Sequence, residues 1–256
     1  MSELRALIFD VDGTLADTER DGHRVAFNCA FAEAGLDWDW TVPLYGQLLE
    51  VGGGKERIRF YLQQYQPDFQ APEDLDGFIA ELHRHKTQHY QQLLAAGKIP
   101  LRPGVERFLR EARSQGLRLA IATTGSLPNA TALLQKHLDP YAPHWFEIIA
   151  AGDIVPFKKP APDIYHYVLQ KMGLAASDCL VFEDSNQGLQ AALGACLKTV
   201  VTVNGYTQSH DLSGATLVLD CLGEPDQPFC AIAGQALDAV NTHYLDLDLV
   251  HRLHSH

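Results

Sequence analysis

Two closely spaced aspartates, Asp10 and Asp12, end the first apolar run of this sequence, in the segment ALIFDVDGTLADTE (6–19). Carboxylates this close repel each other unless something positive lies between them. A spacing of two places both side chains on the same side where a strand ends, and Gly13 lets the backbone turn with a positive φ. The segment therefore suggests a cation site, which other parts of the chain must complete.

Short apolar runs that resemble buried parallel strands recur along the chain, and helical patterns lie between them. The expected strands are 4–9, 117–123, 146–150, 179–182 and 197–203, and the expected helices are about 104–115, 127–137, 162–173 and 186–195. This alternation predicts an α/β fold, with a doubly wound parallel sheet as a Rossmann-like core.

About a hundred mostly helical residues separate the first two expected strands, far more than an ordinary crossover needs. We therefore expect residues 18–99 to form an inserted α-helical domain. The α/β core is then discontinuous, comprising residues 1–17 and 100–256. The segment GKIPLRPGV, rich in Pro and Gly, marks the return to the core.

Ligands of an open parallel sheet bind at the carboxyl ends of its strands, so the residues directly after each strand are the candidates for chemistry. Hydroxyl and N–H groups there can hold a phosphate oxygen, and carboxylates can hold a metal ion. The candidates are Thr123 and Thr124 after the second strand, Lys159 after the third, and Glu183 and Asp184 after the fourth.

Acids, hydroxyls and a lysine thus converge at one end of the sheet, which predicts a Mg²⁺ ion between the carboxylates with Lys159 offsetting the remaining charge. Each signal alone has a simpler explanation. Lys159 could be a solvated surface lysine, and Asp184 with Ser185 could simply cap the following helix. Their occurrence at successive strand ends favours a site.

Taken together, these motifs resemble those of the haloacid dehalogenase superfamily over nearly the whole chain, and none departs from the family pattern. The Asp-x-Asp-Gly-Thr motif is residues 10–14, and the hydroxyl after the second strand is Thr123. The lysine of the Lys-Pro-x-Pro-Asp motif is Lys159, and the acidic pair is Glu183 and Asp184.

The resemblance implies that residues 18–99 are a cap domain that sets substrate specificity and that the α/β core is catalytic. It also implies a role for each matched residue. Asp10 would attack phosphorus to form an aspartyl-phosphate, while Asp12 would protonate the leaving oxygen and then activate water. Mg²⁺ would bind Asp10, the backbone carbonyl of Asp12 and Asp184, with Glu183 near it. The matched threonine and lysine would hold the transferring phosphoryl group.

A glycine run before Lys55, in the segment VGGGKERI, is the first candidate substrate site in the cap. The run comprises Gly52, Gly53 and Gly54 and is expected to open a helix, whose N-terminus could bind a second phosphate or sugar hydroxyls. A flexible loop between helices is the alternative.

The segment ELHRHKTQHY (81–90) is amphipathic and basic. Its Lys86 corresponds by position to a substrate-contacting lysine of beta-phosphoglucomutase-like caps, and a solvated helix face is the alternative. Glu19 could reach sugar hydroxyls. His85 and His89 are four residues apart, but a metal pair is not favoured because the sequence shows no accompanying carboxylate set.

Within the superfamily, the cap and the strings LAIATTGSLPN, AAGD and KKPAPDIY look most like the CbbY-type branch, which lies near beta-phosphoglucomutase. The resemblance implies a Mg²⁺-dependent phosphatase of small phosphorylated sugars, with xylulose 1,5-bisphosphate as substrate. Beta-phosphoglucomutase activity is the alternative, because it uses the same chemistry. A signalling phospho-acceptor domain or a non-catalytic binding protein is less favoured, since the chain has a cap and both aspartates.

Composition limits the remaining possibilities. The net charge of −12 argues against binding to nucleic acid or to an anionic membrane. No apolar run approaches the roughly 18 residues of a membrane span, no signal peptide is evident, and the five cysteines are widely spaced, so we expect a cytoplasmic protein. A phosphorylated sugar is the expected partner, and a monomer the expected state.

The C-terminal stretch gives expectations about structure only. After about residue 204, the run ATLVLD is strand-like, and a helix is expected later. The final HRLHSH (251–256) is expected to be a disordered end. No role is assigned to this region.

Overall fold

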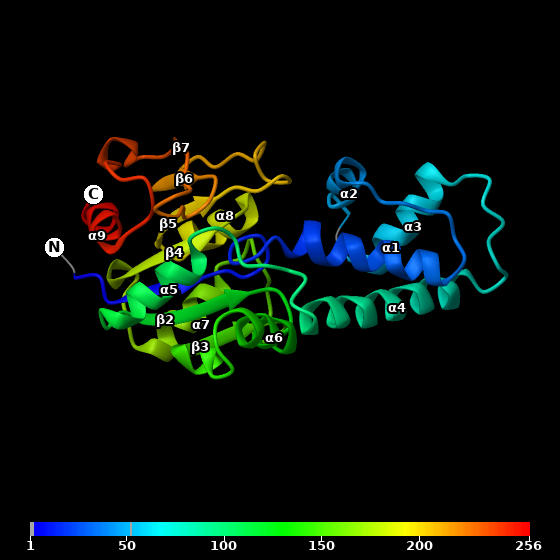
Figure 1. Ribbon diagram of the computed structural model, residues 1–256, viewed down its shortest axis with the longest axis horizontal. Helices are drawn as coiled ribbons and strands as arrows, with labels where there is room; N and C mark the ends of the chain where they lie inside the picture. Colours follow the sequence, from blue (N-terminus) through cyan, green and yellow to red (C-terminus); the bar gives the residue numbers. More distant parts are fainter. Residues whose placement is uncertain (1–2, 52) are drawn as a thin grey trace. The chain divides into compact units, whose positions relative to one another are not determined.

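The computed structural model describes residues 3–51 and 53–256, and the chain divides into two compact units. One unit comprises Met1–Asp17 with Pro100–His256, and the other is Thr18–Ile99. Figure 1 shows that the first unit is an α/β structure and that the second is built from helices.

Seven strands of the described residues form one sheet in the first unit, in the order β3-β2-β1-β4-β5-β6-β7. Neighbours from β3 to β6 are parallel, and only β7 pairs antiparallel, with β6. This order reverses at β1, which confirms the doubly wound α/β fold. The strands are β1 (Ala6–Phe9), β2 (Arg118–Thr123), β3 (Phe146–Ala151), β4 (Cys179–Glu183), β5 (Lys198–Thr202), β6 (Leu217–Leu219) and β7 (Ala231–Ala233).

Helices cover both faces of the sheet. On one face, α7 and α8 pack against Ala6 and Ile8 of β1 in a continuous apolar cluster. On the other face, Phe108 of α5 packs against the stacked rings of Phe9 and Phe182, whose centroids are 4.7 Å apart. Burial on both faces explains why the strands read as continuous apolar runs. The helices of this unit are α5 (Val105–Ser114), α6 (Leu127–His137), α7 (Asp163–Met172), α8 (Asn186–Gly194) and α9 (Leu247–Ser255).

An aromatic core holds the helical unit together. The buried ring of Trp40 lies 4.5 Å from Phe27 and 5.4 Å from Tyr61, measured between centroids, so residues of three segments meet at it. No helix in the described part of the chain is both long and apolar enough to cross a membrane. The elements of this unit are a π-helical segment (Thr18–His23), α1 (Arg24–Glu33), α2 (Val42–Leu48), α3 (Gly54–Tyr65) and α4 (Leu75–Ala95).

The expected disorder at the C-terminus is wrong, because most of HRLHSH belongs to α9. Asp246 caps this helix by accepting a hydrogen bond from the Leu249 backbone N–H at 2.8 Å. Leu249, Leu253 and His254 are buried, so one face of α9 packs on the α/β unit. The strand expected in ATLVLD is present as β6.

A buried arginine, Arg102, connects the turn after β1 to strands β5 and β6. Its guanidinium donates to the backbone carbonyls of Gly13, Thr202, Val203 and Asp220. Carbonyl oxygens thereby replace the water that a buried guanidinium would lose. Arg102 thus ties the turn that follows Asp10 to the ends of β5 and β6.

Candidate active site

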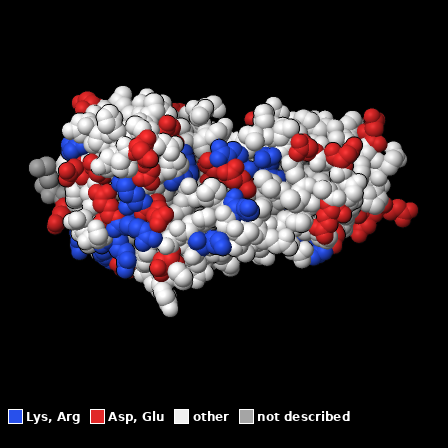
Figure 2. Space-filling view, in the orientation of Figure 1, with Lys and Arg blue, Asp and Glu red and all other residues white. Residues whose placement is uncertain are grey.

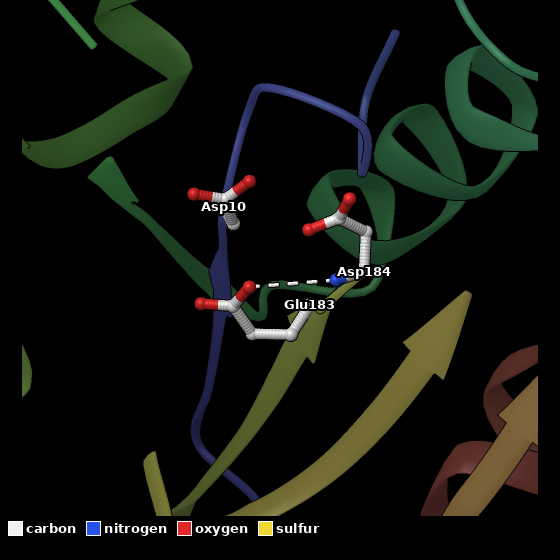
Figure 3. Close-up of side chains that lie close together, drawn as sticks. All are labelled: Asp10, Glu183 and Asp184. Atoms are coloured by element: carbon white, nitrogen blue, oxygen red, sulfur yellow. Dashed lines mark hydrogen bonds between the residues drawn. The ribbon is translucent and has the colours of Figure 1, made fainter. Parts of the chain in front are cut away.

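The carboxyl ends of β1 and β4 bring three acids together. Asp10 directly follows β1, Glu183 is the last residue of β4, and Asp184 comes next. All three side chains are buried, and one carboxylate oxygen from each lies within 4.8 Å of the others. Figure 3 shows the three carboxyl groups facing a common space, where adjacent parallel strands end.

Lys159 lies among these acids. Its Nζ donates to Asp10 Oδ1 at 2.8 Å, to Glu183 Oε1 at 2.5 Å and to the Ala122 carbonyl at 2.9 Å. The side chain is 6% exposed, so Lys159 is not a solvated surface lysine. Burial alone would lower the pKa of Lys159, but the carboxylates of Asp10 and Glu183 outweigh it and hold that pKa above its usual value. The ammonium therefore stays charged.

The acids carry more negative charge than Lys159 balances. Burial raises the pKa of Glu183 to about 7. Burial, together with the neighbouring Asp10 and Glu183 carboxylates, raises the pKa of Asp184 well above its usual range. Within the described residues, this is the one group of three ligating side chains close enough to hold a metal ion. An oxygen-only donor set with unbalanced negative charge suits Mg²⁺.

Thr123 and Asp12 meet at the end of β2. The Thr123 hydroxyl donates a long hydrogen bond to Asp12 Oδ2 at 3.5 Å and accepts a hydrogen bond from the Gly125 N–H at 3.0 Å. A Cβ at Gly125 would lie 2.5 Å from the same Asp12 oxygen, so any larger residue there would displace the Asp12 carboxylate. Thr124, which lies between Thr123 and Gly125 in the sequence, is exposed to solvent. The structure thus brings Asp12 and Thr123 together at the site.

The capping explanation applies to Ser185 and not to Asp184. The Ser185 hydroxyl accepts a hydrogen bond from the Gly188 N–H at 3.2 Å and so caps α8. Asp184 Oδ2 instead accepts from Asn204 Nδ2 at 2.8 Å. Gly13 has φ +89°, and a Cβ there would overlap the Asp184 carboxylate. The close approach of Asp184 to the backbone therefore requires glycine at that turn.

Sequence reasoning missed two residues at this site, Asn204 and Tyr165. Asn204 lies just beyond the end of β5, so the same rule about strand ends could have found it. The hydroxyl of Tyr165 donates to Glu183 Oε1. Burial and the Glu183 charge raise the pKa of Tyr165 well above its usual value, so the hydroxyl remains a donor. Tyr165 is the last residue of the motif string KKPAPDIY, but no sequence pattern near it predicts the contact with Glu183.

A second polar cluster lies inside the helical unit. Glu19 Oε2 accepts a hydrogen bond from the Tyr45 hydroxyl at 2.6 Å, and Lys86 Nζ lies 2.8 Å from His23 Nδ1. Lys86 Nζ is also 5.0 Å from the centroid of the Phe27 ring. Lys86 is only 9% exposed, so it does not belong to a solvated helix face.

The glycine run leads into α3, which begins at the last glycine of the run, Gly54. Gly52 lies outside the described residues. Gly53 has φ +90°, and the side chain of Lys55 is exposed in the first turn of α3. A Cβ at Gly54 would lie 2.5 Å from His83 Nε2 on α4, so α4 packs closely against this helix start.

The histidines His85 and His89 share a carboxylate partner, Glu33, that the sequence analysis did not predict. Glu33 Oε2 lies 3.0 Å from His85 Nδ1 and 2.7 Å from His89 Nε2. These contacts join α4 to α1. Unlike the acids of the core, these three side chains do not bring their ligand atoms within 4.8 Å of one another.

The fold is that of a known enzyme family. A family model for haloacid dehalogenase-like hydrolases matches residues 4–195. The chain therefore belongs to the haloacid dehalogenase-like hydrolase family and is an enzyme. This confirms the resemblance seen in the motifs.

Individual relatives are similar over most of their length. The chain is 48% identical over 225 residues to the plasmid-encoded protein CbbY of Cupriavidus necator, covering 88% of each chain. It is 48% identical over 213 residues to protein CbbY of Rhodobacter capsulatus, covering 83% of this chain and 91% of the relative.

Solved structures of a CbbY protein agree with the fold. The crystal structure of CbbY from Rhodobacter sphaeroides in complex with phosphate has a TM-score of 0.71 and 42% identity, covering 91% of this chain and 98% of the other. A D10N mutant of that protein in complex with xylulose-(1,5)bisphosphate has the same TM-score and coverage at 41% identity.

Replacing Asp184 with Asn should weaken the response of the protein to Mg²⁺. We expect Mg²⁺ to raise the Tm of the wild type and the Asp184→Asn variant to bind Mg²⁺ at least about 10-fold more weakly, because a charged ligand is lost. Thermal unfolding against Mg²⁺ concentration measures this. Asp153→Asn, which changes an exposed aspartate paired with Lys158, is the control and should respond like the wild type. An unchanged response in Asp184→Asn would contradict the metal site.

Protonation of His23 should make the stability of the protein depend on pH. Burial, together with Lys86 and Arg57, lowers the pKa of His23 to about 3, although Glu19 opposes this. The unfolded chain takes up this proton near pH 6.5 but the folded chain does not, so stability present above that pH is lost as pH falls. We expect a loss of about 1–2 kcal/mol between about pH 7 and pH 5.

Urea unfolding of the wild type and of His23→Asn measures this loss. Asn can still accept a hydrogen bond from Lys86 but does not titrate, so its stability should change less with pH. His144→Asn, a change at an exposed histidine, should follow the wild type. Equal pH dependence in His23→Asn and the wild type would show that His23 is not the group responsible.

Proposed function

We propose that this enzyme is a Mg²⁺-dependent phosphatase of small phosphorylated sugars, that it works through an aspartyl-phosphate on Asp10, and that xylulose 1,5-bisphosphate is its substrate. The observation that carries this proposal is the buried Asp10 carboxylate, held by Lys159 within a group of acids. The bisphosphate complex of the Rhodobacter sphaeroides relative supports the choice of substrate.

Asp10 is the proposed nucleophile. A carboxylate is ionised at neutral pH, so it needs no base to attack phosphorus. Lys159 holds Asp10 Oδ1, and Oδ2 is the oxygen that we assign to the attack. The main obstacle is repulsion between the carboxylate and an anionic phosphate, and the Lys159 ammonium reduces it. Positioning and charge neutralisation supply most of the catalysis in phosphoryl transfer.

Asp12 is the proposed acid and base. An alkoxide leaves poorly, so Asp12 protonates the leaving oxygen and then takes a proton from the water that hydrolyses the aspartyl-phosphate. The contact with the Thr123 hydroxyl supports this role because it limits the orientations of the Asp12 carboxylate. Thr123, Thr124 and Lys159 are assigned to hold the phosphoryl oxygens.

The residues assigned to hold Mg²⁺ are Asp10, the backbone carbonyl of Asp12, and Asp184, with Glu183 near it. When bound, Mg²⁺ supplies positive charge that neutralises the phosphoryl oxygens. Asn204 supports this assignment because its amide keeps Asp184 turned toward the other acids.

Residues 18–99 are assigned as the cap that selects the substrate, with residues 1–17 and 100–256 as the catalytic core. Lys55 lies in the first turn of α3, a 12-residue helix whose N-terminus favours an anion. We assign the distal phosphate to Lys55, to Lys86 and to the run Gly52, Gly53 and Gly54, and sugar hydroxyls to Glu19.

The proposed activity is tested by phosphate release from a panel of sugar monophosphates and bisphosphates, with Mg²⁺ and with EDTA. We expect Mg²⁺-dependent release from xylulose 1,5-bisphosphate to exceed that from monophosphates by about 10-fold or more in kcat/KM. Asp10→Asn should abolish release, because an amide cannot attack phosphorus. Asp153→Asn, with its exposed side chain, should keep full activity.

Two outcomes would contradict the proposal. Activity of Asp10→Asn at a tenth of the wild-type rate or more would exclude Asp10 as the nucleophile. Conversion of beta-glucose 1-phosphate to glucose 6-phosphate without net phosphate release would instead assign the enzyme as a beta-phosphoglucomutase. The cytoplasmic compartment and the monomeric state stay predictions from the sequence.

Lys55→Ala tests the assignment of the distal phosphate. We expect kcat/KM for the bisphosphate to fall by about 10-fold and that for p-nitrophenyl phosphate to change less than about 2-fold, because the small ester has no distal phosphate. Arg59→Ala is the control on the same helix, since Arg59 pairs with Asp76. Equal losses on both substrates would show that Lys55 does not bind the distal phosphate.

A further inference from the structure

The ammonium group of Lys159 has no hydrogen-bond donor to spare. An ammonium has three N–H groups. Lys159 directs them to Asp10 Oδ1, to the Ala122 carbonyl and to Glu183 Oε1. A phosphoryl oxygen that binds Lys159 must therefore replace one of these three partners.

Glu183 is the partner of Lys159 that also accepts a hydrogen bond from a second side chain, that of Tyr165. Its Oε1 accepts from the Tyr165 hydroxyl as well as from Lys159. Its Oε2 lies 3.4 Å from the Asp184 backbone N–H and presses against Gly188, where a Cβ would overlap the carboxylate. Glu183 is thus confined on one side by backbone and held on the other by Tyr165.

Tyr165 is rigidly placed for this contact. It lies on α7 and is fully buried in the apolar cluster between that helix and β1, β2 and β4. Its ring centroid is 5.3 Å from Lys159 Nζ, so one aromatic ring borders both members of the ion pair. A hydroxyl on a buried ring cannot follow a moving carboxylate, and it therefore defines where Glu183 Oε1 stays.

We infer that Tyr165 is a positioning residue of this site, whose hydroxyl holds Glu183 in place when Lys159 turns one N–H from Glu183 to the phosphoryl group. The inference rests on the proposed function and goes beyond it. Without the hydroxyl, Glu183 Oε1 keeps only the hydrogen bond from Lys159, while Oε2 keeps its long contact with the Asp184 N–H. Lys159 must then leave this buried carboxylate oxygen without a donor in order to bind phosphate, which is costly.

Tyr165→Phe removes the hydroxyl and keeps the ring. We expect kcat for xylulose 1,5-bisphosphate to fall by about 10-fold, with KM changed less than about 2-fold, because the contact matters when the phosphoryl group moves. Tyr167→Phe, at a partly buried tyrosine on the same helix, is the matched control and should keep the wild-type kcat. Melting temperatures and circular dichroism verify that both variants fold.

A double-mutant cycle with Glu183→Gln distinguishes positioning from a general loss of packing. If Tyr165 acts through Glu183, Tyr165→Phe should lower kcat by less than about 2-fold in the Glu183→Gln background. The same factor in both backgrounds, or a Tyr165→Phe variant as active as Tyr167→Phe, would overturn the inference and leave the phosphatase intact. A wild type without phosphate release would overturn the proposed function and this inference together.

Discussion

The Lys159 ammonium, held between the carboxylates of Asp10 and Glu183, is the interaction on which the rest of the site depends. Removing three charges from water is costly unless they are paired and hydrogen-bonded. Here Lys159 uses all its donors, and Tyr165 adds one more to Glu183. The buried charges can persist because these contacts replace the lost hydration.

The sheet and its glycines make this concentration of charge possible. Parallel pairing aligns Phe9 of β1 with Phe182 of β4, so the residues that follow them reach the same edge. The carboxylates then approach the backbone so closely that a Cβ would overlap Asp184 at Gly13 and Glu183 at Gly188. The glycine of the Asp-x-Asp-Gly-Thr motif therefore serves packing as well as the turn.

The parts of this site that could be predicted are those with a local signal in the sequence. Apolar runs locate the strand ends, and the strand ends locate the acids. Arg102 could not be found in this way, because it lies 89 residues from Gly13 and 100 from Thr202, and only the folded chain joins them. A helix late in the chain was expected, but its extension through HRLHSH was not, although an aspartate cap precedes an amphipathic run that reaches Ser255.

Charge also explains why an acidic protein can act on an anionic substrate. On the face shown in Figure 2, Lys and Arg lie among Asp and Glu. Because the net charge is −12, attraction of a phosphate must be local. Three carboxylates and one ammonium leave the core site with a charge of about −2 when fully ionised. A monovalent cation would leave this site negative. A divalent cation brings it close to neutrality, so charge as well as the oxygen ligands favours Mg²⁺ before any phosphate arrives.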